Sequence, residues 1–376
     1  MTIRVMIVDD SAVIRGMLTR AFGDAPEIEV VASLYNGLQA VEQIKALDVD
    51  VVILDVEMPQ MGGIEALPKL LANSPQSRVI MCSTLTLHNA EISIKALEIG
   101  AADYIAKPST RTDKDDITRF YFELIAKVRS LVSKDKLSPV VSTKILPKVE
   151  PRTASLGVAT KPDVKPEVKL EIKPTQKFEA KYPASKVQAI AIGCSTGGPQ
   201  ALATLFKALK TIGIPNVPIF ITQHMPPTFT TILAQHISQA TGKICIEGKD
   251  GDLVEENNIY LAPGDYHMMP VKKENRVVIK INQNPPVNFC RPAVDPMLQS
   301  LVAIYGKNLL TVILTGMGSD GLGGSREVVK AGGTVIAQNE ATCVVWGMPR
   351  AVTDNNLCSA VLTLEEIAAY MAKVCK

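Results

Sequence analysis

Side chains that could accept a phosphoryl group stand at the ends of apolar runs in the first third of the chain. Asp9 and Asp10 follow one run, and Asp55 follows another. Because the carboxyl ends of parallel strands share one edge of a sheet, these three carboxylates should converge. Such a cluster is repulsive unless it holds a cation, and oxygen ligands with room for water suit Mg²⁺. Ser83 and Lys107 end two further runs, and their hydroxyl and ammonium complete the groups that phosphoryl transfer to a carboxylate requires.

A second set of residues, near the carboxy terminus, could catalyse acyl transfer. Ser195 lies in the sequence GCSTGG between an apolar run and a helical pattern, so it forms the centre of a G-x-S-x-G turn. His224 directly follows the run VPIFITQ, and Asp320 follows the run that ends at Thr315. We therefore expect a nucleophile, a general base and an orienting carboxylate at one sheet edge, in the chain order Ser, His, Asp.

Other interpretations of these residues remain open from the residues alone. His267 is a second candidate for the base, and Cys194 is a second candidate for the nucleophile. Gly316, Gly318 and Gly321 form G-x-G-x-x-G, with Glu340 about 20 residues further on, which is the outline of a dinucleotide fingerprint. His224, Asp265 and His267 could bind a metal, although no helical or hairpin spacing favours this site.

The elements that must position these residues alternate between strands and helices. We predict a parallel sheet covered on both faces in each half of the chain, that is, a flavodoxin-like (βα)5 domain followed by a doubly wound, mostly parallel α/β domain. The expected strands of the first half are 3–8, 29–32, 49–54, 78–82 and 102–106, and those of the second half are 188–193, 217–222, 258–261, 277–281, 309–315 and 334–337.

The segment between the two halves has a different composition. Residues 141–186 hold ten Lys or Arg against five Asp or Glu, and prolines interrupt the lysines that recur about every four residues. Proline breaks a helix, so we predict an extended, flexible linker. The expected boundaries are 1–130 for the first domain, 131–186 for the linker and 187–376 for the second domain.

Composition excludes several classes of partner. The net charge is +2 and aromatic residues make up 5% of the chain, which argues against nucleic-acid binding. No apolar run approaches the roughly 20 residues that span a bilayer, so membrane insertion is not expected. Seven cysteines without a C-x-x-C pair and a start without signal-peptide features indicate a cytoplasmic protein.

The first 125 residues or so resemble the receiver domains of response regulators. The resemblance is carried by VDDS at 8–11, LDVEMPQMGG at 54–63, CSTLT at 82–86 and GAADYIAKP at 100–108. It implies that Asp55 accepts the phosphoryl group and that Asp9, Asp10 and Asp55 bind Mg²⁺. It also implies switch roles for Ser83, Tyr104 and Lys107, and a cis bond between Lys107 and Pro108.

Residues 187–376 resemble the catalytic domain of the bacterial chemotaxis protein-glutamate methylesterases. The motifs are IGCSTGG at 192–198, ITQHMPPTFT at 221–230, YLAPGDYHM at 260–268, PPVNFCRPAVD at 285–295, LTGMGSDG at 314–321 and AQNEATCVVWGMPR at 337–350. The resemblance implies that Ser195 is the nucleophile, that His224 is the base and that Asp320 orients it. The amide of Met317 would bind the oxyanion, with Thr196 beside the site.

The same resemblance implies a function and two kinds of partner. The enzyme would hydrolyse glutamate γ-methyl esters on methyl-accepting chemoreceptors and deamidate specific receptor glutamines. A chemotaxis histidine kinase would supply the phosphoryl group to Asp55, and Mg²⁺ would be needed for this step only. For Arg291, the sequence leaves open either contact with an acidic substrate or a structural ion pair.

Overall fold

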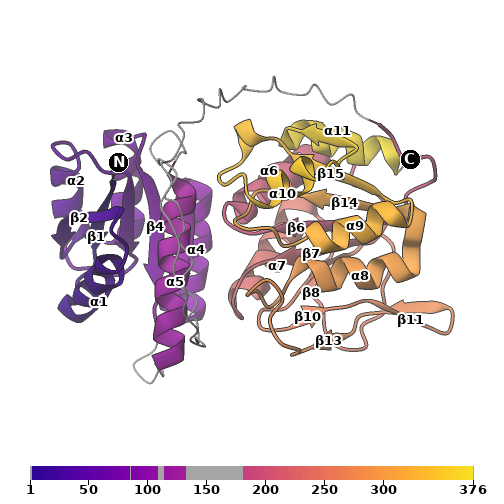
Figure 1. Cartoon of the computed structure of the whole chain (residues 1–376), viewed down its shortest axis with the longest axis horizontal. Coiled ribbons are helices and arrows are strands. Elements are labelled where there is room, and N and C mark those ends of the chain that lie inside the picture. Colours follow the sequence, from indigo (N-terminus) through magenta and orange to yellow (C-terminus); the bar gives the residue numbers. More distant parts are fainter. Residues whose placement is uncertain (1, 85, 109–113, 133–180, 376) are drawn as a thin grey trace, which may run out of the picture.

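The computed structural model describes residues 2–84, 86–108, 114–132 and 181–375. These residues form two α/β domains that pack against each other, with the amino-terminal domain on the left of Figure 1 and the carboxy-terminal domain on the right. Each domain has one main parallel sheet with helices on both faces. The expected fold class is therefore confirmed for both halves.

The amino-terminal domain has a five-stranded sheet in the order β2-β1-β3-β4-β5, and every neighbouring pair is parallel. Its strands are β1 Ile3–Val8, β2 Ile28–Leu34, β3 Val51–Asp55, β4 Arg78–Ser83 and β5 Asp103–Ala106. Its helices are α1 Ala12–Gly23, α2 Gly37–Gln43, α3 Gly63–Asn73, α4 Leu87–Ile99 and α5 Lys114–Leu131.

Alternation along the strands explains how both faces of this sheet are covered. Val5 and Ile7 of β1 belong to a buried cluster with residues of α1 and α5, whereas Met6 and Val8 belong to a cluster with residues of α2, α3 and α4. Successive side chains of a strand point to opposite faces, so a continuous apolar run supplies two cores at once. This arrangement leaves the carboxyl ends of the strands free to carry polar residues.

The carboxy-terminal domain has a seven-stranded sheet in the order β16-β15-β14-β6-β7-β9-β8, again with parallel neighbours throughout. Its strands are β6 Ala189–Cys194, β7 Ile219–Gln223, β8 Cys245–Glu247, β9 Ile259–Leu261, β14 Leu309–Ile313, β15 Thr334–Gln338 and β16 Ala360–Leu362. Its helices are α6 Gly198–Ile212, α7 Phe229–Thr241, α8 Val294–Tyr305, α9 Leu322–Lys330, α10 Met348–Asp354 and α11 Leu364–Val374.

The order of this sheet places a topological switch point between two central strands. From β6 the chain adds β7, then the edge strand β8, and then β9 between them, and it later returns to the other side of β6 to add β14, β15 and β16. In open α/β sheets, ligands bind in the crevice beyond the carboxyl ends of strands at such a point. The ends of β6 and β14 are therefore where a site is expected.

The segment predicted as a strand at 277–281 does not join the main sheet. It is divided between β12 Arg276–Val278, which pairs antiparallel with β11 Val271–Lys273, and β13 Ile281–Asn282, which pairs antiparallel with β10 His267–Met268. Alternation predicts an extended strand but does not specify its partner. The short strands β8 and β16, at the two edges of the main sheet, were not predicted.

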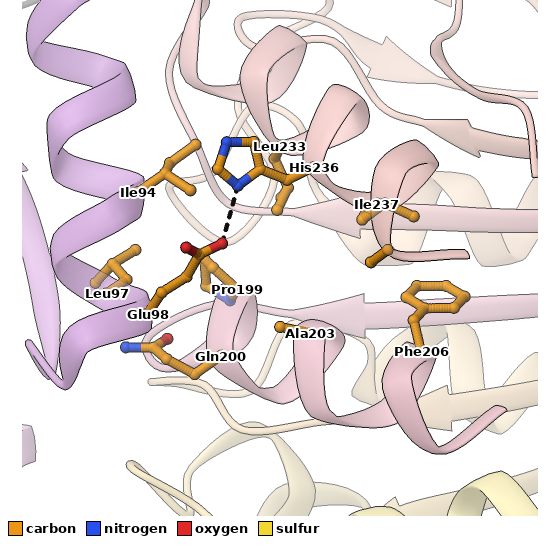
Figure 2. Close-up of a pocket in the computed structure, with 11 residues that line it drawn as sticks. Ile94, Leu97, Glu98, Pro199, Gln200, Ala203, Phe206, Leu233, His236 and Ile237 are labelled. Carbon is orange, nitrogen blue, oxygen red and sulfur yellow. Dashed lines mark hydrogen bonds and ion pairs between the residues drawn. The ribbon is translucent and has the colours of Figure 1, made fainter. Parts of the chain in front are cut away.

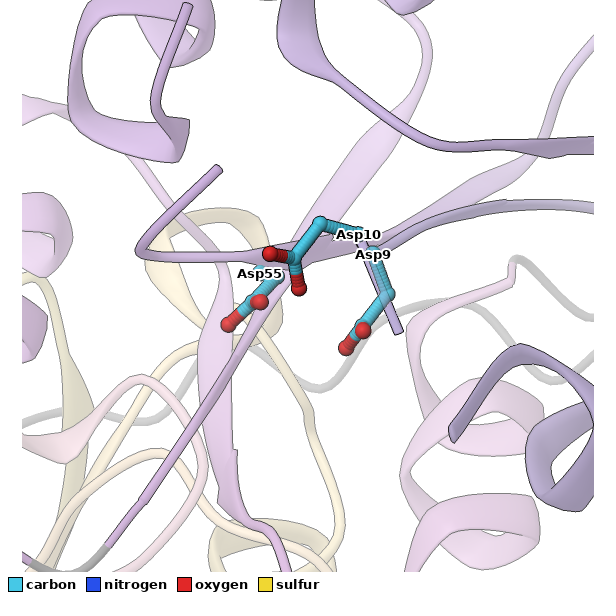
Figure 3. Close-up of side chains that lie close together, drawn as sticks. All are labelled: Asp9, Asp10 and Asp55. Carbon is cyan, nitrogen blue, oxygen red and sulfur yellow. The ribbon is translucent and has the colours of Figure 1, made fainter. Parts of the chain in front are cut away.

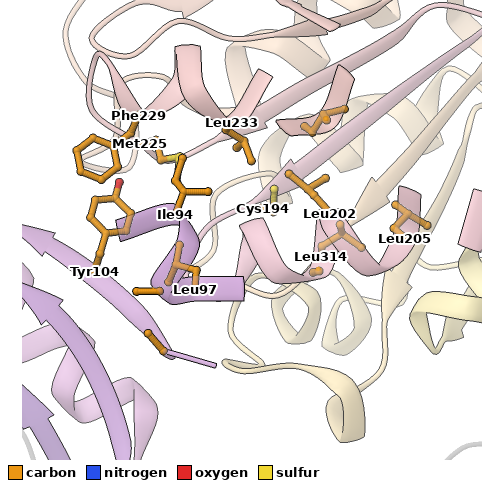
Figure 4. Packing of buried hydrophobic residues seen from close by; sticks show 14 of the residues in the cluster. Ile94, Leu97, Tyr104, Cys194, Leu202, Leu205, Met225, Phe229, Leu233 and Leu314 are labelled. Carbon is orange, nitrogen blue, oxygen red and sulfur yellow. The ribbon is translucent and has the colours of Figure 1, made fainter. Parts of the chain in front are cut away.

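The two domains share a continuous apolar core. One buried cluster contains Ile94, Leu97 and Tyr104 from the amino-terminal domain together with Met225 and Phe229 from the other domain. Figure 4 shows these side chains facing each other, and the rings of Tyr104 and Phe229 stack with their centres 4.5 Å apart. Buried apolar surface of this kind holds the domains in one arrangement.

Polar contacts surround this apolar core on the side of α6 and α7. Gln200 donates a hydrogen bond of 2.6 Å to the carbonyl of Ala101, and His236 Nδ1 lies 3.0 Å from Glu98 Oε1. Figure 2 shows Gln200, Glu98 and His236 around a small cavity of about 50 Å³ that lies between α4 on one side and α6 and α7 on the other. The interface therefore combines apolar packing with a few specific hydrogen bonds.

Most of the predicted linker, 133–180, lies outside the described residues. Its last residues contact the carboxy-terminal domain, because Lys181 N donates to Ser359 O and the ring of Tyr182 stacks on Tyr370 of α11. One expectation is wrong: the bond between Lys107 and Pro108 is trans, and the cis bond among the described residues is Arg291–Pro292. Both isomers of a bond before proline are close in energy, so the sequence does not fix the choice.

Within the described ranges, none of the helices combines the length and the apolar character that a bilayer crossing requires.

Candidate functional sites

The three carboxylates predicted to converge do so at the carboxyl edge of the amino-terminal sheet. Asp9 and Asp10 follow β1 and Asp55 ends β3, and their oxygens lie within 4.8 Å of one another (Figure 3). Lys107, which follows β5, places Nζ 2.7 Å from Asp9 Oδ2 and 2.8 Å from Asp55 Oδ1. Three oxygen ligands from adjacent positions, one of them exposed, fit a hydrated Mg²⁺ ion.

The electrostatics of this cluster keep Asp55 close to a protonation equilibrium. Burial raises the pKa of Asp55 to about 6, even though Lys107 opposes the shift. Burial alone would lower the pKa of Lys107, but its hydrogen bonds to Asp55 and Asp9 raise it above 10.5. A buried carboxylate is stabilised by added positive charge, so a cation here would favour the ionised, nucleophilic form of Asp55.

The side chains of two residues predicted to switch this domain have partners other than Asp55. The Ser83 hydroxyl is 2.9 Å from the hydroxyl of Ser93 in α4, and Asn89 donates to the hydroxyl of the neighbouring Thr84. Tyr104 is buried against Phe229 of the other domain. Both side chains would have to leave these partners in order to turn toward a phosphoryl group on Asp55.

In the carboxy-terminal domain, Ser195 lies at the switch point of the sheet. It follows β6 directly, and its amide donates a hydrogen bond of 3.0 Å to the carbonyl of Thr315, just beyond β14. Gly197 has φ +76°, which glycine adopts without strain, and α6 begins at the next residue. The tight turn therefore presents Ser195 between two strand ends and beside the amino terminus of a helix.

His224 and Asp320 are brought together as predicted. His224 Nε2 lies 2.8 Å from Asp320 Oδ2, although 96 residues separate them in the chain. Asp320 is buried and accepts further hydrogen bonds from the amides of Val294 and Gly321 and from the side chain of Asn288. Burial alone would raise the pKa of Asp320, but its bond to His224 and these amides lower it, so it stays ionised.

The second nitrogen of the His224 ring faces a residue that the sequence did not single out. Nδ1 lies 3.4 Å from the thiol sulfur of Cys290. Among the hydrogen bonds of the described residues, none joins the hydroxyl of Ser195 to His224, although the His224 amide donates to the carbonyl of Cys194 next to Ser195. Catalytic hydrogen bonds are often long before substrate binds, so the separation is compatible with the predicted roles.

Cys290 also changes the basicity of His224. Burial alone would lower the pKa of the imidazole, but the nearby Cys290 and Asp320 raise it well above the usual 6.5. His224 must be neutral to accept the proton of Ser195, so this environment favours the resting, protonated form. No spacing rule links a cysteine 66 residues away to a histidine, and only proximity in the fold shows the pair.

The residues predicted to bind the oxyanion lie around Ser195. Gly316 approaches so closely that a Cβ atom there would lie 2.9 Å from Ser195 Cβ, and Met317 follows it directly. Thr196 is buried, and its hydroxyl donates a hydrogen bond of 2.8 Å to Asp103 of the amino-terminal domain. Met317 also packs against the core cluster of the amino-terminal domain. The loops that carry Ser195 and Met317, the predicted nucleophile and oxyanion donor, are therefore part of the domain interface.

The alternative residues have structural partners instead. His267 is buried, accepts from the amide of Ala293 and lies 3.2 Å from the carbonyl of Pro285. Arg291 forms an ion pair with Asp265 at 2.6 Å, which is the structural role that the sequence left open. Burial of Cys194 raises the pKa of its thiol well above the usual 9. In the described part of the chain, the carboxylates of the amino-terminal domain are the group that could hold a metal.

Comparison with known proteins matches two parts of the chain to two protein families. Residues 5–118 match the response regulator receiver domain family, and residues 190–371 match the CheB methylesterase family. One curated relative is the protein-glutamate methylesterase/protein-glutamine glutaminase 1 of Rhodospirillum rubrum, which is 46% identical over 99% of this chain and 95% of its own length. Another is the protein-glutamate methylesterase/protein-glutamine glutaminase of Azospirillum brasilense, which is 48% identical over 99% of this chain and 92% of its own length.

A solved structure matches the carboxy-terminal half. The catalytic domain of the Thermotoga maritima CheB methylesterase is 36% identical, with a TM-score of 0.48 over 50% of this chain and 100% of its own length. Identity over nearly the full length of the curated relatives, through the receiver domain and the catalytic domain alike, decides the relationship. The chain belongs to the CheB methylesterase family and carries an amino-terminal response regulator receiver domain.

Proposed function

We propose that the protein is a phosphorylation-regulated enzyme of chemotaxis in the cytoplasm that hydrolyses glutamate γ-methyl esters and deamidates glutamines on methyl-accepting chemoreceptors. The observation that supports this most directly is the pairing of His224 with Asp320 at 2.8 Å beside Ser195, at the switch point of the sheet. The same loops contact the receiver domain, which links the chemistry to a regulatory input.

The first step is acylation of Ser195. His224 takes the proton of the Ser195 hydroxyl through the ring nitrogen that does not face Asp320, and the oxygen attacks the ester carbonyl carbon. The oxyanion that forms lies near the Met317 amide and the first turn of α6. His224 then returns the proton to the methoxy oxygen, methanol leaves and a glutamyl-serine ester remains.

The second step is hydrolysis of that ester. His224 accepts a proton from water, the hydroxide attacks the same carbonyl carbon, and the proton passes to Ser195 as the free carboxylate leaves. A glutamine side chain follows the same route with ammonia as the leaving group. Because an amine is the poorer leaving group, deamidation depends more strongly on protonation by His224.

The receiver domain supplies control through Asp55. A histidine kinase would provide the phosphoryl group, and Mg²⁺ held by Asp9, Asp10 and Asp55 would neutralise charge on it during transfer. Lys107 then pairs with the phosphoryl group. A new charge of about −1.5 to −2 draws Ser83 and Tyr104 toward Asp55, and Tyr104 thereby leaves its stack on Phe229.

Separation of the domains then uncovers the catalytic loops. Thr196 and Met317, on either side of the oxyanion position, contact the receiver in the unphosphorylated protein. A receptor helix is about 10 Å across with its side chains, so it needs a wider opening than a small ester. Loss of the Tyr104 contact weakens the interface and favours the open arrangement.

Methanol release from a methylated receptor fragment tests the catalytic assignment. Ser195→Ala should lower the rate by about 10³-fold or more, because the covalent route is lost. The adjacent Cys194→Ala serves as the matched control and should retain activity, since this thiol is buried with a strongly raised pKa. Full activity of Ser195→Ala, or loss of activity only in Cys194→Ala, would contradict the assignment.

A further inference from the structure

A tight hairpin turn beside the catalytic pair has an unusual residue at its tip. Val287 and Cys290 pair through two backbone hydrogen bonds of 3.1 and 2.9 Å, and the two residues between them, Asn288 and Phe289, have φ of +52° and +64°. Two-residue turns with both central residues left-handed favour Asn followed by Gly. Asn288 suits its position, but Phe289 stands where glycine is expected, so this backbone is strained.

The turn is fixed to both members of the catalytic pair. The Asn288 side chain donates a hydrogen bond of 2.9 Å to Asp320 Oδ1 and another of 3.0 Å to Asp295 Oδ2. The Cys290 sulfur lies 3.4 Å from His224 Nδ1. Phe289 lies between the two residues that make these contacts, so its position relative to the site is set on both sides. The strained turn is thus held rigidly at the catalytic pair.

The side chain of Phe289 is fully exposed and is not packed within the protein. Its exposed fraction is 102%, compared with 71% for Phe122, which lies on α5 of the receiver domain. Exposure of an aromatic side chain and a left-handed backbone at a bulky residue are both unfavourable in the isolated chain. The receiver domain does not cover Phe289 in the packed arrangement, so the ring is available before the domains separate.

We propose that Phe289 is a specificity-determining residue that packs against an apolar side chain of the substrate helix. Residues three or four positions apart on a helix lie about 5–6 Å from each other, so a side chain one turn from the modified glutamate could meet a ring beside the catalytic pair. This inference rests on the proposed function. Phe289 recognises the substrate helix that carries the ester, whereas Ser195, His224 and Asp320 act on the ester itself.

Variants of the full-length protein separate substrate contact from structural support. In Phe289→Gly the backbone strain is relieved, so the midpoint of thermal unfolding should stay the same or rise. With a methylated receptor fragment, its kcat/KM should fall by about tenfold, mainly through KM, because the lost contact is apolar burial in the complex. With the γ-methyl ester of N-acetylglutamate, kcat/KM should remain within about twofold of the parent value, since this substrate has no helix.

Two further variants complete the design. Phe289→Leu should restore most of the activity on the receptor fragment, because it keeps an apolar side chain at the tip. Phe122→Ala removes an exposed ring on α5 of the receiver domain, and it should leave kcat/KM for both substrates unchanged when acetyl phosphate is the phosphodonor.

An unchanged receptor rate in Phe289→Gly, or equal losses on both substrates, would overturn the inference; equal losses would mean that the ring only supports the catalytic pair. If the parent protein hydrolyses neither substrate, the proposed function itself fails. This result differs from the two outcomes above, in which the parent protein is active.

Discussion

At the scale of single residues, the least expected contact is that between Cys290 and His224. The thiol occupies the ring nitrogen that should face Ser195, at 3.4 Å, while Asp320 holds the other nitrogen at 2.8 Å. Both neighbours favour the protonated imidazole. If His224 is the proposed base, it must therefore lose a proton and exchange its Cys290 partner before it can activate Ser195.

Cys290→Ala should consequently change the pH dependence of hydrolysis. The pKa of His224 is raised, and only the neutral ring accepts a proton, so the rate rises with pH until this pKa is reached. Removal of Cys290 lowers the pKa, which should move the acid limb of the kcat/KM profile to lower pH. The rate at neutral pH should then rise several-fold, because the neutral fraction of the ring grows about tenfold when its pKa falls by one. The assay is hydrolysis of a small γ-methyl ester across pH.

Cys358→Ala provides the control, because this thiol is partly buried beside Thr353 and does not contact the catalytic pair. Cys358→Ala should leave the pH dependence of kcat/KM unchanged. An unmoved acid limb in Cys290→Ala would show that the thiol does not influence the base.

At the scale of elements, the catalytic residues depend on close approach between the ends of β6 and β14. The Ser195 amide bonds to the Thr315 carbonyl, and Gly316 lies against Ser195 without room for a side chain. The two strands are neighbours only because the chain reverses its direction of sheet growth between them. The oxyanion position next to Met317 is thus a product of this strand pairing.

Gly316→Ala tests this dependence. The added Cβ would lie 2.9 Å from Ser195 Cβ and 3.0 Å from the Ser195 amide nitrogen, and a backbone atom cannot move aside as a flexible side chain can. Overpacking of this kind costs about 1–3 kcal/mol, so we expect a lower unfolding midpoint and at least a tenfold loss of ester hydrolysis.

Gly16→Ala is the matched control, because a Cβ at Gly16 in α1 meets nothing within 4 Å. It should stabilise the helix by about 0.5–1 kcal/mol and leave hydrolysis unchanged. Full activity in Gly316→Ala would mean that the loop after β14 does not constrain Ser195.

At the scale of the whole molecule, the receiver packs on the loops that carry Ser195 and Met317, the proposed nucleophile and oxyanion donor. Asp103 accepts from Thr196 beside the nucleophile and also pairs with Lys127 at 2.5 Å, while the next residue, Tyr104, stacks on Phe229. A change in β5 therefore acts directly on the turn that holds Ser195. The interface is maintained by apolar contacts and a small number of hydrogen bonds, which a phosphorylation event can disturb.

Weakening the rim of this interface should release the enzyme without phosphorylation. The double variant Glu98→Gln, Gln200→Ala removes one ion pair and one hydrogen bond that join the domains. The exposed Glu98 pair is worth about 0.2–1 kcal/mol and the Gln200 hydrogen bond about 0.5–1.5 kcal/mol, so receptor hydrolysis without phosphodonor should rise about three- to tenfold. With acetyl phosphate and Mg²⁺, the variant and the parent protein should converge.

Glu65→Gln removes an exposed ion pair with Lys69 within α3 and serves as the control, with no expected change in either state. If the unphosphorylated double variant is no faster than the parent, this interface does not limit access to the site.

Apolar runs and the polar residues that follow them were enough to predict both parallel folds and the strand ends at which the reactive residues lie. Asp9, Asp10 and Asp55 converge, and His224 meets Asp320, because apolar runs mark buried strands and the polar residues at their ends or in the loops that follow lie at the same sheet edge. Conversely, the run at 277–281 predicts extended structure but not its partner, so its place outside the main sheet was missed.

The contacts between loops and between domains are visible only in the folded chain. Cys290 beside His224, Phe289 at its strained turn and Thr196 bonded to Asp103 all join residues that no periodicity relates. Local patterns fix which face of a strand or helix is buried, whereas contacts between loops depend on the relative placement of whole elements. The reactive residues could therefore be predicted from strand ends, but the contacts that join them to the receiver domain could not.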